Sequence, residues 1–549
     1  MTSTVSTAPS PEPQASPAPV WRSPLGMTLA ALVLGLSVEL LFDRRPLGVS
    51  FAIWAFLCVV ALLVVAARER IRTSWDGWWL VAPILFFSAM VFVRLEPMTV
   101  LLDFGLTLAL FALWIRVFRS GRLARFGWLD FGLALAWVPL EACFRPWRVL
   151  SEAWNLAAGE RGRRSRLAPI LRGLLLALPV VIIFAALLSA ADLVFSGYLT
   201  AVLHWLRLDQ IAELLGRAAI VIVSGIFLLG ASAVALRTTG ERRLIGEEKP
   251  LLSPFVGFTE SVVLLGAVDL LFSAFVAVQF AYLFGGQANI TAAGYTYSDY
   301  ARRGFGELVA VSVLTLGMIL ALGYLSKREG RWPIAWFNGL SGLLVGLVGV
   351  ILASAMMRLL MYESAYGFTR LRTYTHVAIL WMAALFVAFL GLLIAGRLRP
   401  FALATVIGIL GFGVTLNLLN VDAFITRQNA SRLAASGEVD VAYLASLSYD
   451  AAPALVQMAA AAPAEVRSEL LPELACWQAQ MLDRGQRVGW PSYHLSYVSA
   501  LRSLATLQDE LSGYPVEWQP YDESVPEWGG NWVVTVGAKE QPCSTGWAD

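Results

Sequence analysis

The sequence predicts an all-α fold: a polytopic transmembrane helical bundle of about 11–12 spans, followed by a small C-terminal soluble helical domain. Of the 549 residues, 58% are apolar and 15% are charged, against about 25% charged in ordinary soluble domains. The mean hydropathy is +0.67. Apolar runs of about 17–25 residues recur from Leu25 to Asn420, which is the length that a helix needs to cross a bilayer core of about 30 Å.

The apolar runs give the predicted spans. Short basic connectors separate many of them, and tryptophans stand near several predicted ends, as at a membrane interface. The expected helices cover residues 25–42, 49–67, 78–94, 98–118, 127–143, 170–191, 214–236, 257–285, 303–325, 334–361, 374–396 and 400–420.

The positive-inside rule decides between eleven and twelve crossings. The weakest span is 127–143, which carries Asp130, Pro139 and Glu141 in about 17 residues, the lower limit for a crossing. If it does not cross, the basic stretches 145–172, 237–249, 327–331 and 397–399 become cytoplasmic, while Arg370 and Arg372 fall outside. We therefore expect eleven crossings, a cytoplasmic N-terminus and an extracytoplasmic C-terminal domain. Whether 127–143 crosses the membrane stays open.

Composition divides the chain into successive regions. The segment at 145–168 is interpreted either as an amphipathic helix on the anionic leaflet or as an ordinary basic loop. The C-terminal domain is expected to contain several short helices over 424–511 and an aromatic tail from Tyr514. The predicted regions are a disordered Pro/Ser/Ala-rich leader (1–22), a four-span region (23–126), a short apolar segment with its basic helix or loop (127–169), the C-terminal transmembrane bundle (170–421) and the soluble domain (422–549).

The four cysteines fall into two groups. Cys58 and Cys143 lie in apolar segments, where a thiol is usually a small buried hydrophobe. Cys476 and Cys543 are the two in the C-terminal domain. An extracytoplasmic location would allow a disulfide between them, but chance occurrence explains the pair equally well.

Several function classes are disfavoured. A net charge of +2 argues against nucleic-acid binding. The sequence has no phosphate-binding glycine loop, dinucleotide fingerprint, Cys-x-x-Cys or His-Glu-x-x-His. We therefore expect no cofactor, no metal and no catalytic residues, and we favour a non-enzyme. Gly342-x-x-x-Gly346 is interpreted as a helix-packing motif.

Polar residues at membrane depth are the remaining candidates, because such groups usually face the bundle interior or a water-filled cavity. Asp269 is the sharpest, since it stands alone in the middle of an apolar stretch. The polar residues at this depth are Glu39, Asp103, Asp130, Glu141, Asp192, Glu260, Asp269, Gln279, Glu307, Arg358, Glu363, His376 and Asn417.

Eight residues form the candidate functional set. The segment from Tyr282 to Glu307 is interpreted either as a re-entrant loop that lines a cavity or as a structural turn. For Arg303 with Glu307, and for Arg358 with Glu363, the favoured interpretation is a simple charge pair that fixes helix register, and a functional role is the alternative. The candidates are Asp269, Gln279, Tyr297, Tyr300, Arg303, Glu307, Arg358 and Glu363.

A family resemblance follows from several stretches of the sequence. These include Phe258–Ser261, Gly294-Tyr-Thr-Tyr-Ser-Asp-Tyr300, Tyr362–Arg372, Asn420–Phe424 and Asp440–Leu455. They resemble the bacterial membrane family catalogued as domain of unknown function 4173, close to the sets labelled 4153. The resemblance implies a multi-pass protein of the bacterial cytoplasmic membrane, without a known activity, substrate or cofactor.

Three functions remain open. The first is a sensor or scaffold that presents residues 422–549 to a partner in the envelope or the membrane. The second is a secondary transporter or channel with a polar cavity around Asp269, Arg303 and Glu307. The third is a membrane-embedded transferase with an outward carboxylate such as Asp43 or Asp299. The partners expected are the lipid bilayer and a protein bound by the C-terminal domain, and no nucleic acid.

Overall fold

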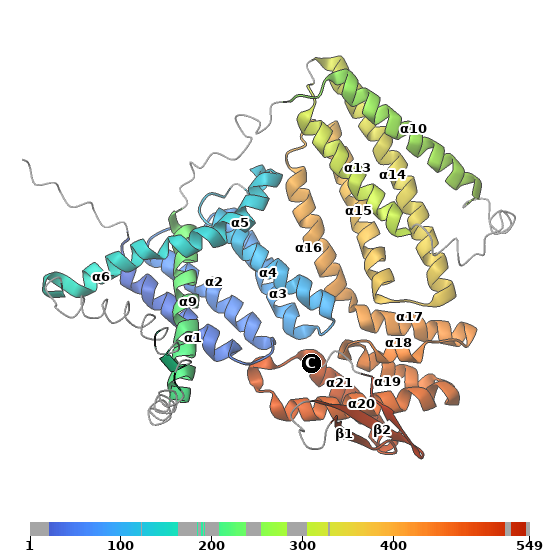
Figure 1. Cartoon of the computed structure of the whole chain (residues 1–549). Coiled ribbons are helices and arrows are strands. Elements are labelled where there is room, and N and C mark those ends of the chain that lie inside the picture. Colours follow the sequence, from blue (N-terminus) through green and yellow to red (C-terminus); the bar gives the residue numbers. More distant parts are fainter. Residues whose placement is uncertain are drawn as a thin grey trace, which may run out of the picture. The chain divides into compact units, whose positions relative to one another are not determined.

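The computed structural model describes residues 21–121, 123–162, 208–237, 254–282, 305–327, 330–521 and 529–544, together with Phe184, Leu188, Ser189 and Asp192. These residues are mostly helical, which confirms the all-α fold (Figure 1). The helices of the apolar region are α1 (Pro24–Phe42), α2 (Val49–Arg68), α3 (Trp75–Val93), α4 (Pro97–Val117), α5 (Trp128–Phe144), α6 (Pro146–Gly162), α9 (Leu208–Arg237), α10 (Phe258–Tyr282), α13 (Phe305–Leu325), α14 (Arg331–Tyr366), α15 (Arg370–Ile394) and α16 (Phe401–Leu419).

Ten helices in this part of the chain are long and apolar enough to cross a membrane. They are α1–α4, α9, α10 and α13–α16. Helix α5 has 17 residues and is not among them. The predicted span at 170–191 lies almost wholly outside the described residues. The segment after α5 is helical, as α6, and exposes Trp147 and Trp154.

The chain divides into two compact units. The first comprises residues 1–39, 60–72 and 140–237. Within it, a Cβ at Gly35 would lie 2.3 Å from the Val221 carbonyl oxygen, and one at Gly230 would lie 1.8 Å from that of Ala142. Glycine therefore allows α9 to approach both α1 and α5 at backbone distance.

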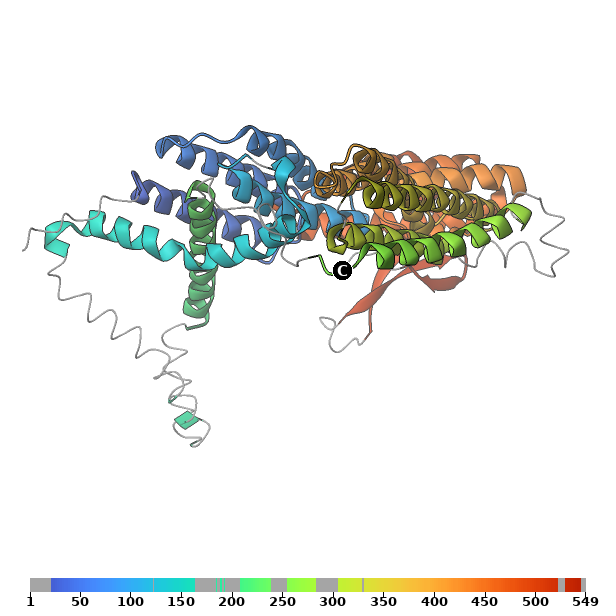
Figure 2. The same ribbon diagram turned by 90° about the horizontal axis from the view of Figure 1, so that it is seen from above.

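The second unit comprises residues 40–59, 73–139 and 238–549. Helices α3 and α4 form a hairpin, while α10 and α13 pack on α14, α14 on α15 and α15 on α16 (Figures 1 and 2). Phe337, Leu344, Phe389 and Phe401 are buried in the resulting apolar core. Within Gly342-x-x-x-Gly346, a Cβ at Gly342 would touch Leu390, whereas one at Gly346 would meet no described atom within 4 Å.

The C-terminal domain continues directly from the last apolar helix. Asn420 takes a left-handed conformation, φ 53°, which Asn tolerates better than most residues, and α17 starts at the next residue. One hydrophobic core runs from Val377 and Leu416 in the apolar helices to Leu455 and Trp477 in this domain. Its helices are α17 (Val421–Ser436), α18 (Val441–Ala445), α19 (Ala452–Ala461), α20 (Ala464–Arg487), α21 (Leu495–Leu504) and α22 (Gln508–Leu511), with a 3-10 turn, η2 (Tyr449–Ala451), before α19.

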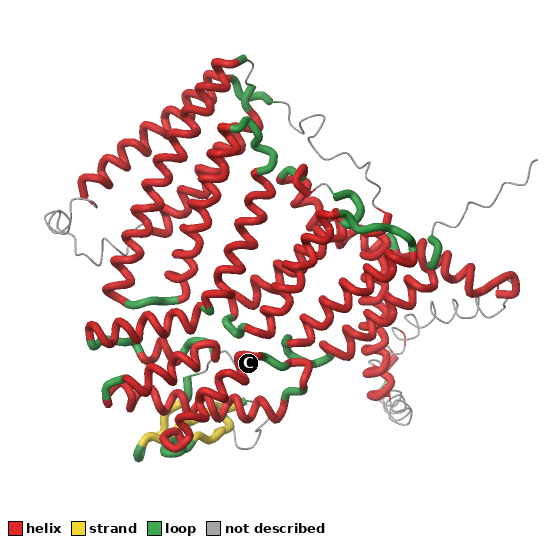
Figure 3. The backbone as a smooth tube through the Cα atoms, turned by 180° about the vertical axis from the view of Figure 1, so that it is seen from behind, coloured by secondary structure: helices red, strands yellow, loops and turns green. Residues whose placement is uncertain are grey.

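The expected aromatic tail is instead a three-stranded antiparallel sheet, drawn in yellow in Figure 3. Strands β1 (Val516–Pro520), β2 (Gly530–Val536) and β3 (Lys539–Pro542) follow in order. The prediction from the sequence includes no strands here, but the β-branched run at Val533–Val536 favours one. Gly537, φ 65°, supplies the tight turn that pairs β2 with β3.

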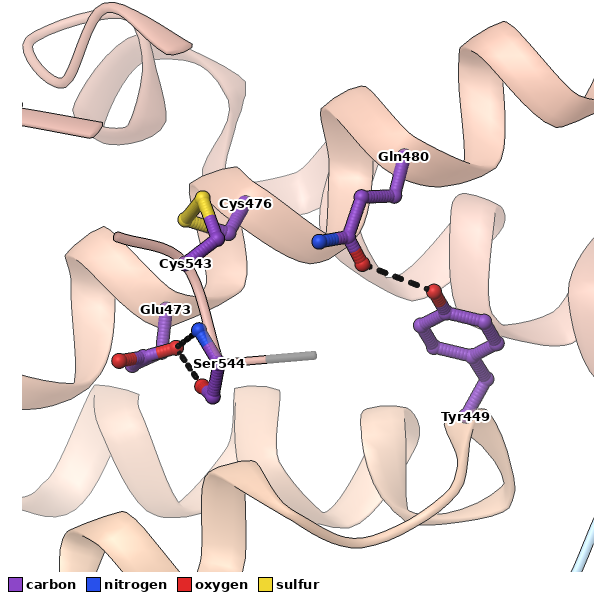
Figure 4. The surroundings of a disulfide bond; sticks show 6 residues. All are labelled: Tyr449, Glu473, Cys476, Gln480, Cys543 and Ser544. Carbon is purple, nitrogen blue, oxygen red and sulfur yellow. Dashed lines mark hydrogen bonds between the residues drawn. A yellow bond between two sulfur atoms is a disulfide. The ribbon is translucent and has the colours of Figure 1, made fainter. Parts of the chain in front are cut away.

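A disulfide joins Cys476 of α20 to Cys543, just after β3 (Figure 4). Both residues are buried, at 0% and 6% exposed. The Ser544 amide and hydroxyl donate to Glu473 on the same helix, the amide at 3.3 Å. Of the two alternatives left by the sequence, the structure has the bonded pair, and it ties the sheet to the helices.

Candidate functional site

A cluster of buried polar residues joins the apolar helices to the C-terminal domain. We call it the junction network and define it as Arg94, Glu96, Arg370, Asp422 and Asp450. Glu96, Asp422 and Asp450 are only 3%, 0% and 4% exposed. Figure 1 shows the α3–α4 turn, the start of α15 and the end of α16 at the edge that meets the C-terminal domain.

Asp450, in the η2 turn, holds the turn between α3 and α4. Its Oδ2 accepts hydrogen bonds from the backbone amides of Leu95, at 2.7 Å, and Glu96, at 3.0 Å. The Ser496 hydroxyl donates to its Oδ1. Burial raises the pKa of the Asp450 carboxyl, and the hydrogen bonds from Ser496 and Leu95 oppose that rise.

Glu96 caps the helix that follows this turn. Its carboxylate accepts from the amides of Met98, at 3.1 Å, and Thr99, at 2.7 Å, so it occupies the N-cap position of α4. The Arg370 Nε lies 3.8 Å from it. An acidic residue at this place stabilises the helix start and also faces the cation of α15.

Arg370 binds Asp422 in a fork. Its Nε donates to Oδ1 at 2.8 Å and its Nη2 to Oδ2 at 2.6 Å. The Ser448 backbone amide also donates to Asp422 Oδ2, at 2.8 Å. The Arg370 backbone amide donates to the Tyr443 hydroxyl at 2.9 Å. Bidentate pairing of this kind fixes orientation as well as charge.

Arg94 extends the network to the end of α16. Its Nε and Nη2 donate to the backbone oxygen of Asn417 at 3.0 and 2.5 Å. The Asn417 side-chain amide donates in turn to Asp103 Oδ1 of α4 at 2.7 Å. Burial lowers the pKa of Arg94, while Asp450 and Asp103 favour its charged form.

A second set of contacts joins the domain to the connection between α1 and α2. The Ser492 hydroxyl donates to the Pro46 oxygen at 2.7 Å, and His494 Nε2 lies 2.6 Å from the Leu47 oxygen. The Val49 amide donates to the Tyr493 oxygen at 3.0 Å. Burial lowers the pKa of His494 and so favours the neutral ring.

The predicted set is only partly brought together. Gln279 of α10 accepts from Ser354 and Arg358 of α14, each at 2.9 Å. Glu363 pairs with His376 at 3.1 Å. The structure therefore gives Arg358 and Glu363 these two partners rather than the pairing with each other that the sequence suggested.

The remaining candidates either lie elsewhere on α10 and α13 or fall outside the described residues. Asp269 is 4% exposed within α10, and neither carboxylate oxygen has a hydrogen-bond partner among the residues described. Glu307 is exposed in the first turn of α13. Tyr297, Tyr300 and Arg303 fall outside the described ranges, so the proposed loop and the Arg303–Glu307 pair stay predictions.

Sequence reasoning missed the junction network as a functional unit. Arg370 had one signal, because it stood on the wrong side of the membrane under the positive-inside rule. Asp422 and Asp450 lay within Asn420–Phe424 and Asp440–Leu455, two stretches that carried the family resemblance. In the described ranges no cluster of three or more His, Cys, Asp or Glu side chains could hold a metal ion.

Comparison with known proteins places the chain in a family. A family model described as "Domain of unknown function (DUF4153)" matches residues 81–458. No curated protein and no solved structure matches. The resemblance to set 4173 is thereby corrected to the neighbouring set. The match covers more than half of the chain and includes every residue of the junction network, so the chain belongs to the DUF4153 family.

Proposed function

We propose that the protein is a sensor or scaffold of the bacterial cytoplasmic membrane. Its C-terminal domain, outside the cytoplasm, is held firmly on the membrane helices and offered to a protein partner in the envelope or the membrane. The junction network is the observation that carries the proposal. It connects buried charged groups of the domain to the ends of α3, α4, α15 and α16, so movement on one side is transmitted to the other.

The distribution of basic residues supports this orientation. The connections that touch the C-terminal domain follow α1, α3 and α14. The opposite ends of the helices include Val117, the last residue of α4, and Ile394, the last residue of α15. They also include Leu325, the last residue of α13, whose backbone oxygen accepts from the Val256 amide at 3.2 Å. Among the described residues, connections on the opposite side contain Arg119, Arg125, Lys327, Arg331, Arg397 and Arg399, against Arg44, Arg45, Arg94, Arg370 and Arg372 on the side of the domain. The positive-inside rule then assigns the domain to the outer side and the start of α1 to the cytoplasm.

The disulfide gives independent support. Disulfides persist in oxidising compartments and are rare in the cytosol. The Cys476–Cys543 bond lies within the same domain that the basic residues assign to the outside.

Cysteine labelling tests the orientation. Cys58 and Cys143 are replaced by alanine, and Cys476 and Cys543 are retained as the disulfide. Two variants then each carry one new cysteine, at the exposed position Ser436 or Arg397. Intact cells are treated with a membrane-impermeant maleimide. We expect labelling at 436 and protection at 397 until the cells are opened, and the reverse pattern would contradict the proposal.

Coupling between domain and membrane is tested by substitution. Asp450→Ala removes the acceptor for the Leu95 and Glu96 amides, so the C-terminal domain should become protease-sensitive in membranes while the chain still inserts. Ser436→Ala, at the exposed end of α17, is the matched control. Equal protease resistance of the two variants would show that the network does not hold the domain.

A secondary transporter is the second candidate, and Asp269 favours it. A buried carboxylate whose oxygens have no partner in the described chain is a typical ion or proton ligand within a membrane. Gln279, Ser354 and Arg358 form a buried polar contact on the helices α10 and α14. Proteoliposomes with an internal pH dye test this function, and proton or sodium flux that Asp269→Asn abolishes would favour it over the scaffold.

A further inference from the structure

Asp103 and Asn417 form a polar pair that is buried completely, each at 0% exposed. The pair joins α4 to α16 through one hydrogen bond, from Asn417 Nδ2 to Asp103 Oδ1 at 2.7 Å. The other two polar atoms of the pair, Asp103 Oδ2 and Asn417 Oδ1, have no partner in the described part of the chain. Both are oxygens, so in an ionised site two buried acceptors lack any donor.

The orientation of the Asn417 amide is fixed by its neighbours. Nδ2 also donates to the Gly413 backbone oxygen at 3.0 Å, so both of its hydrogens have acceptors. A flipped amide would turn Oδ1 toward two oxygens and would lose both hydrogen bonds. The unpartnered Oδ1 is therefore a property of the site and does not result from the choice of amide rotamer.

Among the described residues, the neighbouring groups do not supply the missing donor. Arg94 and Glu96 are the charged groups that act on Asp103. Arg94 is committed to the Asn417 backbone oxygen through Nε and Nη2. The Thr107 hydroxyl donates to the backbone oxygen of Asp103, at 2.7 Å, and not to its carboxylate.

We propose that Asp103 binds a proton in the folded protein and forms a reciprocal acid–amide pair with Asn417. With the proton on Oδ2, that atom becomes a donor to Asn417 Oδ1, and a ring of two hydrogen bonds closes. The carboxylate takes up the proton from the solvent, and the only covalent bond formed is the O–H bond of the acid. Each buried oxygen then has a partner, which avoids a penalty of about 1–3 kcal/mol for each unsatisfied group.

The proton site is linked to the junction network through Asn417. The backbone oxygen of Asn417 binds Arg94, and its side chain binds Asp103. Loss of the proton would place a negative charge beside Asn417, whose backbone oxygen accepts the hydrogen bonds of Arg94. This proposal goes beyond the scaffold function, because it assigns a bound proton to the Asp103–Asn417 pair between α4 and α16.

Isosteric substitution gives the first test, in the full-length protein purified in detergent. Asp103→Asn places an amide where the protonated acid stands, and its Nδ2 can donate to Asn417 Oδ1. We expect a Tm close to that of wild type. Asp422→Asn is the matched control, because Asp422 is also 0% exposed but is paired with Arg370, and its Tm should fall by several degrees. If Asp103→Asn falls as far as the control, or does not accumulate in the membrane, Asp103 is ionised and the proposal is wrong.

Infrared spectroscopy and cation dependence give the second test. A protonated carboxylic acid has a carbonyl band distinct from that of a carboxylate, and one such band of wild type should vanish in Asp103→Asn but persist in Asp269→Asn. Sodium, potassium and a large organic cation at equal ionic strength should give the same Tm. No lost band, or a sodium-specific rise in Tm that Asp103→Asn removes, would overturn the proton in favour of an ionised or sodium-binding carboxylate.

Discussion

Arg370, the first residue of α15, donates two hydrogen bonds to the carboxylate of Asp422 in α17, at 2.8 and 2.6 Å. The Asp422 side chain is fully buried and that of Arg370 is 20% exposed. The pair therefore joins a membrane helix to the first helix of the C-terminal domain at a place from which water is largely excluded.

Breaking this pair should destabilise the chain strongly. Arg370→Ala leaves the Asp422 carboxylate buried without its cation, and loss of one partner of a buried pair costs about 3–5 kcal/mol. Thermal unfolding of the full chain in detergent measures the effect. Glu438→Gln is the control, since Glu438 is paired with Arg432 but its side chain is 76% exposed, and it should change stability by less than about 1 kcal/mol. Equal effects of the two variants would contradict the prediction.

His494 should make the domain sensitive to mild acid. Burial lowers its pKa in the folded state from the ordinary 6.5; the hydrogen bond with the Leu47 oxygen opposes this shift, and the Arg484 charge adds to it. The neutral ring is thus favoured by folding, so its stabilising effect is present above pH 6.5 and is lost as the pH falls through the pKa values of the unfolded and folded states. His494→Gln retains an N–H donor for Leu47 but does not titrate. Its Tm should change less than that of wild type between about pH 7.5 and 5.5, a window that spans the unfolded pKa, and parallel curves would exclude this role.

Removal of the disulfide should loosen the sheet. The double variant Cys476→Ala/Cys543→Ala opens a loop with a sequence separation of 67 residues, and loss of a native disulfide typically costs about 2–5 kcal/mol. Limited proteolysis should cut within 515–544 sooner than in wild type. The double variant Cys58→Ala/Cys143→Ala removes the two free cysteines and should retain the wild-type cleavage pattern. Unchanged protection of the sheet would mean that packing alone holds it.

Gly230 should tolerate no side chain. A Cβ there would lie 1.8 Å from the Ala142 carbonyl oxygen, so Gly230→Ala must push α9 away from α5. At Gly349 a Cβ would meet no described atom within 4 Å, and alanine there gains helix propensity of about 1 kcal/mol. Detergent-solubilised Gly230→Ala should melt below wild type, whereas Gly349→Ala should melt at or above it.

The sequence predicted the helices well because hydropathy in a membrane protein is a local signal. The runs at 257–285 and 374–396 correspond to α10 and α15 with ends within a few residues. Length also singled out 127–143, and its helix α5 has 17 residues. The sheet at the end of the chain was missed, although the β-branched run at Val533–Val536 favours a strand.

Partner choice was not predictable for most polar residues. Asp103 and Asn417 were both noted at membrane depth, but they are 314 residues apart. Arg358 was expected beside Glu363, five positions along, and is hydrogen-bonded to Gln279 on another helix. Spacing along one helix indicates which side chains can meet, whereas the packing of several helices decides which of them do meet.

The hydrogen bond from Leu95 to Asp450 spans 355 residues of sequence, and this separation has a consequence for biogenesis. During synthesis the α3–α4 turn enters the membrane long before Asp450 leaves the ribosome, so its amides must wait for their acceptor. In a chain that stops before Asp422, the Leu95 and Glu96 amides lack the Asp450 acceptor, and Arg370 lacks the Asp422 carboxylate. The hydrogen bonds that fix this turn can therefore form only after the chain has been synthesised through Asp450.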